Sequence, residues 1–467
     1  MIEITPLLES EHKSPLYIQL SNYIKQEIYS KRIKPGEKLP SKRKLADHLG
    51  LSINTIQNAY EQLISEGLVE SILRKGLYIK VLEDELPHAF INNEKSQLPS
   101  CEKSINIEFD FNSGRVDLEH FPYSVWKNLS IQSLYEDQGE LLNIGNPQGE
   151  LLLREEIAKY LFMSRGVKCF PEQIVIGAGT QVLITILSLL IDKDNLYGLE
   201  NPGFHRTKKL LQDLGKATIA IPLDKDGINM EQLKNTGASV VYVTPSHQFP
   251  IGMIMPLNRR LELLKWAESK DGYIIEDDYD GEYRYEGKPI PSLQGLDKLG
   301  NVIYMGTFSK ALIPSIRISY MVLPPRLLKK YQENLLLYKQ TVSRLHQDTL
   351  YRFMKEGYWQ SHLNKMRTLY RKKHFFLMDS INKHLNNKVR VIGEKSGLHL
   401  ILEADKSWQE KELVDRALKE GVKVYPLSVY YENGINVNSS VLLGFGGLSE
   451  TQIDMGIQLL KKAWQID

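Results

Sequence analysis

From residue 109 to the C-terminus, short apolar runs alternate with longer amphipathic segments, and this alternation restricts the fold. The runs have strand length and are QIVIGAG, NLYGLE, SVVYVTP, GYIIEDD, NVIYMGT and ISYMVLP. Strands that alternate with helices form a mostly parallel sheet with helices on both faces, because each crossover needs a helix to bring the chain back. We therefore expect an α/β fold whose ligands gather beyond the carboxyl ends of the strands.

The first 82 residues have the pattern of a separate helical unit. Ser41 and Ser52 can each cap a helix that begins at the next residue, and Gly50 and Gly67 can end those two helices. An earlier helix is predicted over 15–30, where apolar residues recur four apart. The residues of that apolar face are Leu16, Leu20, Ile24 and Ile28.

A basic hairpin follows these helices. Residues 68–81 alternate as two short strands around Arg74 and Lys75, and the resulting order is that of a winged helix-turn-helix. Net charge of the chain is only +2, but residues 31–44 hold seven basic residues and one acidic. A basic run alone is more often a solvated surface; its coincidence with two capped helices favours DNA. The predicted DNA-binding residues are Ser41, Arg43, Ser52, Asn54, Thr55, Gln57, Arg74 and Lys75.

Residues 83–108 show no sustained periodicity and are predicted to be a linker between domains at 1–82 and 109–467. Two cysteines give no disulfide framework, which favours a reduced, cytoplasmic setting. The longest apolar run, 182–191, is about half of what a membrane span needs, and no export signal opens the chain. We expect no membrane partner.

Two strings at the ends of predicted strands indicate one site. In GTFSKALIPSIR (306–317), Lys310 follows hydroxyl side chains and precedes Arg317. A lysine that forms a Schiff base with a phosphorylated aldehyde needs such hydroxyls and a cation for the phosphate. IIEDDYD (274–280) ends in carboxylates that can face a protonated pyridine nitrogen, and the helix opening at Thr180 offers free amides to an anion. Together they predict pyridoxal 5'-phosphate, with no metal.

The strings also resemble known families. PGEKLPSKRKLADHLGLSINTIQNAYEQLISEGLV resembles the GntR family of bacterial winged-helix regulators. The span 109–467 resembles fold-type I, aspartate-aminotransferase-like enzymes in NPQGELLLREEIAKYLFMSRGV, VIGAGTQ, ENPGFHR, TPSHQFPIG, IIEDDYD and YMGTFSKALIPSIRISY. Joined, the two parts resemble the MocR/GabR family of regulators. The resemblance implies a winged helix-turn-helix, an aminotransferase-like domain with a smaller C-terminal α/β subdomain, and a homodimer.

The resemblance also implies roles for individual residues. It makes Lys310 the Schiff-base lysine, Asp277 the partner of the pyridine nitrogen and Tyr279 the neighbour of the ring hydroxyl, and these three are the expected catalytic set. Asp277 is preferred to Asp278 by motif register alone. Phe204 is expected to stack on the cofactor ring. The expected phosphate ligands are Gly179, Thr180, Thr307, Ser309 and Arg317.

Two departures from the family pattern bear on function. TPSHQFPIG lacks the asparagine that polarises the ring hydroxyl in aminotransferases, which suits a sensor better than a catalyst. Arg206 is the expected effector ligand, but Val429 stands where GABA-responsive members carry a second arginine, so we do not expect GABA.

We expect a transcriptional regulator that binds double-stranded operator DNA and senses an amine or amino acid through pyridoxal phosphate. A dipeptide, or the cofactor acting as its own signal, stays open as the effector. The alternatives are an active aminotransferase with an accessory DNA-binding head, in which the same residues turn over substrate, and a cofactor-free binding module.

Overall fold

The computed structural model describes residues 4–6, 14–80, 107–135, 139–286, 290–385, 388–405, 408–432 and 439–466. Its internal contacts divide the chain into two compact units, Met1–Lys103 and Ser104–Asp467. Apart from its last two residues, the predicted linker lies outside the described residues, so its boundaries stay a prediction. The two units are therefore described one at a time.

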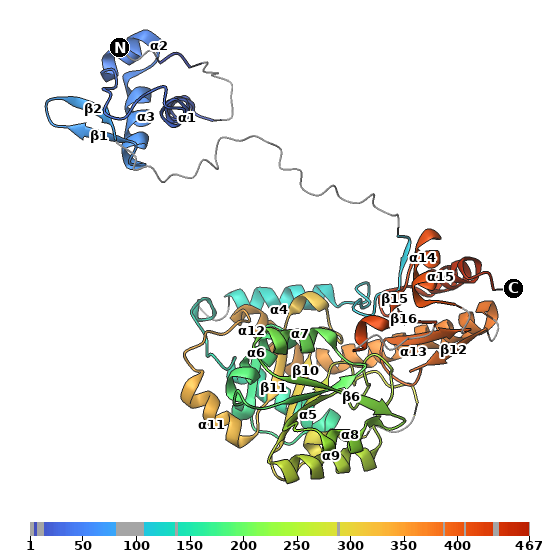
Figure 1. The fold of residues 1–467 in the computed structure, drawn as a ribbon. Helices are drawn as coiled ribbons and strands as arrows, with labels where there is room; N and C mark the ends of the chain where they lie inside the picture. Colours follow the sequence, from blue (N-terminus) through green and yellow to red (C-terminus); the bar gives the residue numbers. More distant parts are fainter. Residues whose placement is uncertain are drawn as a thin grey trace. The chain divides into compact units, whose positions relative to one another are not determined.

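The N-terminal unit contains three helices followed by an antiparallel hairpin (Figure 1). Its elements are α1 (Leu16–Tyr29), α2 (Lys42–Leu49), α3 (Ile53–Ser65), β1 (Val69–Ile72) and β2 (Gly76–Ile79). Ser41 Oγ accepts the amide of Lys44 at 3.3 Å, and Ser52 Oγ accepts the amide of Thr55 at 3.1 Å. Both predicted caps are present, and Gly50 ends α2 with a φ of 64°. The predicted winged helix-turn-helix is confirmed.

An eight-stranded sheet forms the centre of the second unit, in the order β4-β11-β10-β9-β8-β5-β6-β7. Strand β11 is antiparallel to both its neighbours and β7 is antiparallel to β6, while the remaining pairs are parallel. Each predicted apolar run forms a strand; β6 and β7 were not predicted. The strands are β4 (Ile174–Gly177), β5 (Tyr197–Asn201), β6 (Thr218–Asp224), β7 (Gly227–Ile228), β8 (Val240–Val243), β9 (Tyr273–Asp278), β10 (Val302–Thr307) and β11 (Ser319–Val322).

Helices cover both faces of this sheet, as Figure 1 shows and as the sequence alternation predicts. In β4, Ile174 and Ile176 join one apolar core and Val175 joins another, so the strand is buried on both sides. The helices are α4 (Tyr123–Tyr135), α5 (Leu151–Arg165), α6 (Thr180–Leu190), α7 (His205–Asp213), α8 (Met230–Asn235), α9 (Leu257–Lys270), α10 (Leu293–Leu296), α11 (Pro325–Asn334) and α12 (Arg344–Lys355). Short 3-10 turns lie at Glu140–Leu142, Pro171–Gln173, Pro314–Ile316 and Ser428–Tyr430.

A smaller subdomain follows and confirms the predicted C-terminal α/β part. Its antiparallel sheet has the order β12-β13-β16-β15, and β3 (Phe109–Asp110) pairs in parallel with β14, which joins the start of this unit to its end. Its elements are α13 (Tyr358–Leu385), β12 (Val389–Ile392), β13 (His399–Ala404), α14 (Glu410–Lys419), β14 (Val422–Lys423), β15 (Tyr425–Pro426), β16 (Ser440–Gly444) and α15 (Glu450–Ala463). Within the described part of the chain, no helix combines the length and apolarity that crossing a membrane requires.

Candidate functional site

The predicted site residues gather where the parallel strands of the large sheet end. Parallel strands direct their carboxyl ends to the same edge, so segments far apart in sequence meet there. Strands β9 and β10 pair in parallel with Met305 opposite Asp277, which brings the end of IIEDDYD beside the start of GTFSKALIPSIR. The residues that follow each strand are Thr180 after β4, Phe204 after β5, His247 after β8, Tyr279 after β9 and Lys310 after β10.

Lys310 is half-buried, and its amine lies inside the protein. Its Nζ donates a hydrogen bond to the backbone oxygen of Ser113, which belongs to the segment that enters this unit. Burial lowers the pKa of Lys310, while the carboxylate of Asp280 acts in the opposite direction. A lowered pKa makes the unprotonated, nucleophilic amine more accessible near neutral pH, as condensation with a carbonyl requires.

Asp277 is a buried carboxyl group whose hydrogen-bond partner is a tyrosine. The hydroxyl of Tyr242 donates to Asp277 Oδ2, and among the described residues no ion pair to Asp277 is found. Burial raises the pKa of Asp277 to about 7; the bond from Tyr242 opposes this rise, and Asp278 and Asp280 add to it. Such a carboxyl group would gain strongly from a cation placed against it, and a protonated pyridine nitrogen is one.

Asp278 has a different environment from its neighbour. Arg165 Nε donates to its Oδ2 at 2.6 Å, and the hydroxyl of Tyr304 donates to the same oxygen at 2.7 Å. Burial opposes the charged form of Arg165, but Asp278 holds the pKa of that guanidinium above its usual value. Because successive side chains of a strand point to opposite faces, Asp277 and Asp278 cannot serve the same site. Asp278 is therefore engaged by a buried guanidinium and Asp277 is not, while the role of Asp277 at the pyridine nitrogen stays a prediction.

The residues expected around a phosphate converge at the start of α6. Gly179 precedes the helix with a φ of 99°, and a Cβ there would overlap the guanidinium of Arg317, which donates to Ala178 O at 3.3 Å. The buried Ser309 Oγ has no hydrogen-bond partner among the described residues. An unsatisfied hydroxyl, a guanidinium and a helix N-terminus without a side-chain cap are complementary to an anion.

Thr307 supports this predicted anion site from the turn that precedes Ser309. Its Oγ1 accepts the Ser309 amide at 3.2 Å and the Ser319 hydroxyl at 2.8 Å, so it shapes the turn that carries Ser309. Thr180 is the first residue of α6 and is half-buried. The phosphate ligands predicted from sequence are thus close together. Ser319, which donates to Thr307, was not predicted, because it comes beside Thr307 only through the antiparallel pairing of β11 with β10.

Aromatic rings line the same region. Phe204 stacks on Phe249 with ring centroids 4.2 Å apart and planes 4° from parallel, and Tyr279 meets Phe204 edge-on at 5.2 Å. One face of Phe204 is therefore covered by Phe249 in this structure, and stacking of Phe204 on a cofactor ring stays a prediction. Phe249 belongs to TPSHQFPIG, the string that lacks the expected asparagine.

Three buried residues beside Lys310 were not predicted. His247 Nδ1 lies 2.9 and 3.1 Å from the two carboxylate oxygens of Asp280, and 3.1 Å from the hydroxyl of Tyr279. The His399 ring lies 4.7 Å from that of His247. His247 and Asp280 lie inside TPSHQFPIG and IIEDDYD, so these two motifs could have predicted them as site residues. His399 lies on β13, and no local sequence pattern points to it.

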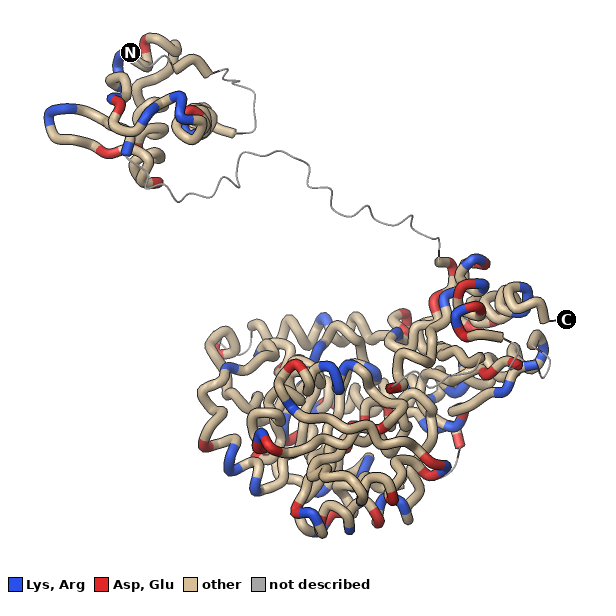
Figure 2. Tube along the Cα trace, viewed as in Figure 1, with Lys and Arg blue, Asp and Glu red and all other residues tan. Residues whose placement is uncertain are grey.

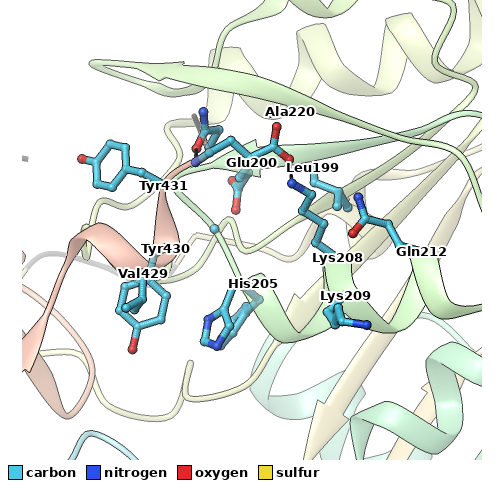
Figure 3. Close-up of a pocket in the computed structure, with 14 residues that line it drawn as sticks. Leu199, Glu200, His205, Lys208, Lys209, Gln212, Ala220, Val429, Tyr430 and Tyr431 are labelled. Carbon is cyan, nitrogen blue, oxygen red and sulfur yellow. Dashed lines mark hydrogen bonds and ion pairs between the residues drawn. The ribbon is translucent and has the colours of Figure 1, made fainter. Parts of the chain in front are cut away.

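Two cavities flank the site. One of about 970 Å³ is lined by Arg206, Arg115 and Lys373 among others. The other, of about 330 Å³, lies between α7 and residues 429–432, and Figure 3 shows Tyr430 there beside His205; Val429 also lines it. Arg206 and Val429 therefore line different cavities. Neither lining includes Lys310 or Asp277, so the converging side chains, rather than the larger volumes, define the site.

The predicted DNA-binding residues of the N-terminal unit differ in accessibility. Thr55 and Gln57 are half-buried; Thr55 shares a 2.8 Å hydrogen bond with Ser52, and Gln57 donates to Glu61 at 2.8 Å. Figure 2 shows cationic residues at the tip of the hairpin. The exposed members of the predicted set are Ser41, Arg43, Ser52, Asn54, Arg74 and Lys75.

The contrast between the two neighbouring aspartates predicts opposite effects on stability. The pKa of Asp277 is higher in the folded than in the unfolded chain, so the folded state binds its proton more tightly and loses stability as pH rises from about 4 to 7. We expect Asp277→Asn to stabilise the ligand-free chain at pH 8 by up to a few kcal/mol. Asp278→Asn should instead destabilise it by about 3–5 kcal/mol, because Arg165 stays buried without its carboxylate.

Chemical denaturation of the full chain at pH 5 and pH 8 measures both effects. The control is Asp271→Asn, which removes an exposed ion pair with Arg326 and should change little. Stability changes of the same sign for Asp277→Asn and Asp278→Asn at pH 8 would contradict the assignment of the two environments.

Comparison with known proteins covers both units. The aminotransferase class I and II family model matches residues 106–458, and the model for bacterial regulatory proteins of the gntR family matches residues 16–79. The HTH-type transcriptional regulator YdeL of Bacillus subtilis is 45% identical over 465 residues, which cover 100% of both chains. The probable rhizopine catabolism regulatory protein MocR of Rhizobium meliloti is 31% identical over 98% of this chain and 95% of its own.

A solved structure agrees with these sequence matches. Pyrococcus horikoshii kynurenine aminotransferase, crystallised with PMP, has a TM-score of 0.68 and 25% sequence identity over 77% of this chain and 91% of that enzyme. The chain therefore belongs to the MocR/GabR family of HTH-type transcriptional regulators, in which a GntR-type domain precedes an aminotransferase class I and II domain.

Proposed function

We propose that this protein is a transcriptional regulator that binds operator DNA through its winged helix-turn-helix and senses an amine through pyridoxal phosphate held at Lys310. The observation that carries the proposal is the convergence of three groups at one edge of the sheet. They are a buried amine, a buried carboxyl group that has no ion-pair partner among the described residues, and a predicted anion site with an unsatisfied hydroxyl. The regulator relatives support the DNA-binding part, and such a protein works in the cytoplasm.

The residues present fit the cofactor. When bound, pyridoxal phosphate supplies an electron-withdrawing ring and an aldehyde that condenses with primary amines. Lys310 offers the amine, and Asp277 would keep a proton on the ring nitrogen. Ser309, Arg317 and the amides of the first turn of α6 would bind the phosphate, which satisfies the otherwise unpaired Ser309 hydroxyl.

Effector recognition is assigned to the larger cavity. Arg206 is exposed at its wall, and Arg115 adds a second cation that is paired with Asp110 at 3.0 Å. A carboxylate carried by the amine would be attracted to Arg206, while Val429 lines the other cavity and adds no charge. This supports an amino compound other than GABA, or the cofactor itself, as the signal. The effector shifts the regulator only by binding one conformation better than another.

DNA binding is assigned to α3 and the hairpin. The N-terminal end of α3 presents Ser52 and Asn54 to solvent, as base contacts from a recognition helix require. Arg74 and Lys75 at the exposed hairpin tip would bind phosphates. Two such units at a fixed spacing read two half-sites, which is the reason to expect a homodimer.

An apolar face of the second unit supports a second copy as the partner. Helix α4 packs on α12 through Ser133, whose hydroxyl lies 3.3 Å from that of Thr349, and through the buried Leu129. Its other side is exposed, and the exposed apolar side chains continue onto the next segments. They are Tyr123, Ile131, Leu134, Tyr135, Leu142, Ile144, Leu151 and Leu152. Apolar groups gathered in this way are typical of an interface.

Removal of the amine tests the sensor. We expect Lys310→Ala to lose the visible absorption band that the wild-type chain shows with pyridoxal phosphate, and to keep basal operator affinity within about twofold, because the DNA-binding unit folds on its own core. Absorbance and electrophoretic mobility shift measure the two properties. Loss of DNA binding in a folded variant would contradict separate roles, and rapid multiple-turnover transamination by the wild type would favour the aminotransferase alternative.

Salt dependence tests the hairpin. Arg74→Ala should lower operator affinity and reduce the slope of log affinity against log salt by about one, because one phosphate contact is lost. Lys80→Ala provides a control: this lysine is also exposed, but it lies at the base of the hairpin rather than its tip. An unchanged slope in Arg74→Ala would remove the hairpin tip from the DNA interface.

The dimer is tested on α4. Placing two carboxylates on the apolar face, as Ile131→Glu with Leu134→Glu, should give a monomer by sedimentation and weaken binding to a two-half-site operator by at least about tenfold. Leu299→Glu places a charge on another exposed leucine and should stay dimeric. A wild-type chain that sediments as a monomer at micromolar concentration would overturn the proposed assembly.

A further inference from the structure

A buried histidine and aspartate hold the hydroxyl of Tyr279, and the proposed function leaves this pair without a role. The side chain of His247 is fully buried and that of Asp280 is 2% exposed. His247 Nδ1 lies 2.9 and 3.1 Å from the Asp280 carboxylate oxygens and 3.1 Å from the Tyr279 oxygen. One ring nitrogen therefore faces three oxygen atoms.

The positions of the protons follow from these partners. A carboxylate only accepts hydrogen bonds, so the hydrogen-bond network assigns a proton to His247 Nδ1, which donates toward Asp280. The Tyr279 oxygen, at a similar distance from the same N–H, is then an acceptor. Since His247 Nδ1 already carries a proton, Tyr279 cannot donate to it, and the Tyr279 O–H stays available for another acceptor.

The surrounding residues hold this arrangement in place. A Cβ at Gly397, whose φ is 75°, would overlap both the His247 ring and the Asp280 carboxylate, so only glycine fits there. His399 packs against His247, and its Nε2 lies 3.1 Å from the Pro250 oxygen. Burial, His247 and Lys310 together keep the pKa of His399 well below its usual value, so His399 is uncharged and bonds to Pro250 as a donor.

The charges that face the pair are those of the Lys310 centre. Asp280 opposes the lowering of the Lys310 pKa that burial causes. Burial raises the pKa of Tyr279, and Asp280 and Asp277 add to that rise. His247, Asp280 and His399 could also present ligand atoms to a metal ion. Hydrogen bonds already engage the Asp280 carboxylate, His247 Nδ1 and His399 Nε2, whereas His247 Nε2 has no partner among the described residues. Because the Lys310 amine beside them is a competing cation, a hydrogen-bonding role is favoured.

We propose that His247, anchored by Asp280, is a positioning residue that holds Tyr279 with its hydroxyl proton free for the ring oxygen of pyridoxal phosphate. The inference rests on the proposed function. In aminotransferases an asparagine polarises that ring oxygen, but TPSHQFPIG has Phe249 in its place. The proposal assigns the hydrogen bond to the ring oxygen to Tyr279, which His247 holds in position. His247 acts through Tyr279 and needs no contact with the cofactor.

The experiment is a pH titration of the visible spectrum of the full-length, cofactor-loaded protein. A hydrogen-bond donor to the ring oxygen reduces the negative charge there, and that charge helps a nearby protonated nitrogen keep its proton. Losing the donor therefore raises the pKa of that nitrogen, and with it the pH midpoint of the titration. We expect His247→Leu to raise the midpoint by about 0.5–1 unit. His247→Asn should restore most of the wild-type value, because its amide can donate from about the position of Nδ1.

Dependence on Tyr279 is the decisive part. Tyr279→Phe should raise the midpoint at least as much, and adding His247→Leu to it should cause no further shift. The matched control is His384→Leu, which removes another histidine–aspartate pair, with His384 Nε2 3.1 Å from Asp454, in the C-terminal subdomain. It should leave the midpoint unchanged, and circular dichroism confirms that each variant is folded.

Each contrary outcome refutes a different claim. An unshifted midpoint in folded His247→Leu, or an equal shift with and without Tyr279, refutes the positioning role while the cofactor assignment stands. One equivalent of zinc or nickel in the wild type that is absent from His247→Leu would make the cluster a metal site instead. A wild-type chain that shows no visible band with added cofactor refutes the proposed function itself.

Discussion

Acidic side chains crowd the end of β9, and the structure depends on giving each of them a separate partner. Glu276 accepts the amides of Leu293 and Gln294 at 2.8 and 3.0 Å. Asp278 is paired with Arg165 and Asp280 with His247. Among the described residues, Asp277 accepts a hydrogen bond only from a tyrosine hydroxyl. Carboxylates this close would repel one another without such partners, and Asp277, whose partner is a neutral hydroxyl group, is the one that would gain most from a cation placed against it.

This distribution of charge also links the lysine to the rest of the site. Asp280 acts on the pKa of Lys310 directly, and it acts on Tyr279 both directly and through His247. The segment that carries Ser113 contacts Lys310 Nζ and leads into β3, which pairs with β14 of the C-terminal subdomain.

Much of this architecture could be predicted because its signals are local. The caps at Ser41 and Ser52 and the six apolar runs needed only nearest neighbours, and the structure confirms them. Strand β6 was missed because TIAIPLD is only partly buried and contains a proline. The linker and the domain boundaries stay predictions, as do the roles assigned to individual site residues. His399 could not be predicted, because it reaches the site from a different sheet.

The sequence by itself determined the two-part organisation, the strand and helix order of each part, and the lysine, carboxylates and hydroxyls needed for the proposed cofactor. Periodicity, capping residues and motif spacing are properties of neighbouring residues, so they are visible without the fold. Only the tertiary structure decided which of two adjacent aspartates is left without a cation, and which histidine holds Tyr279. Those outcomes depend on side chains from α5, from β13 and from the segment after β8, which become neighbours only when the sheets pack.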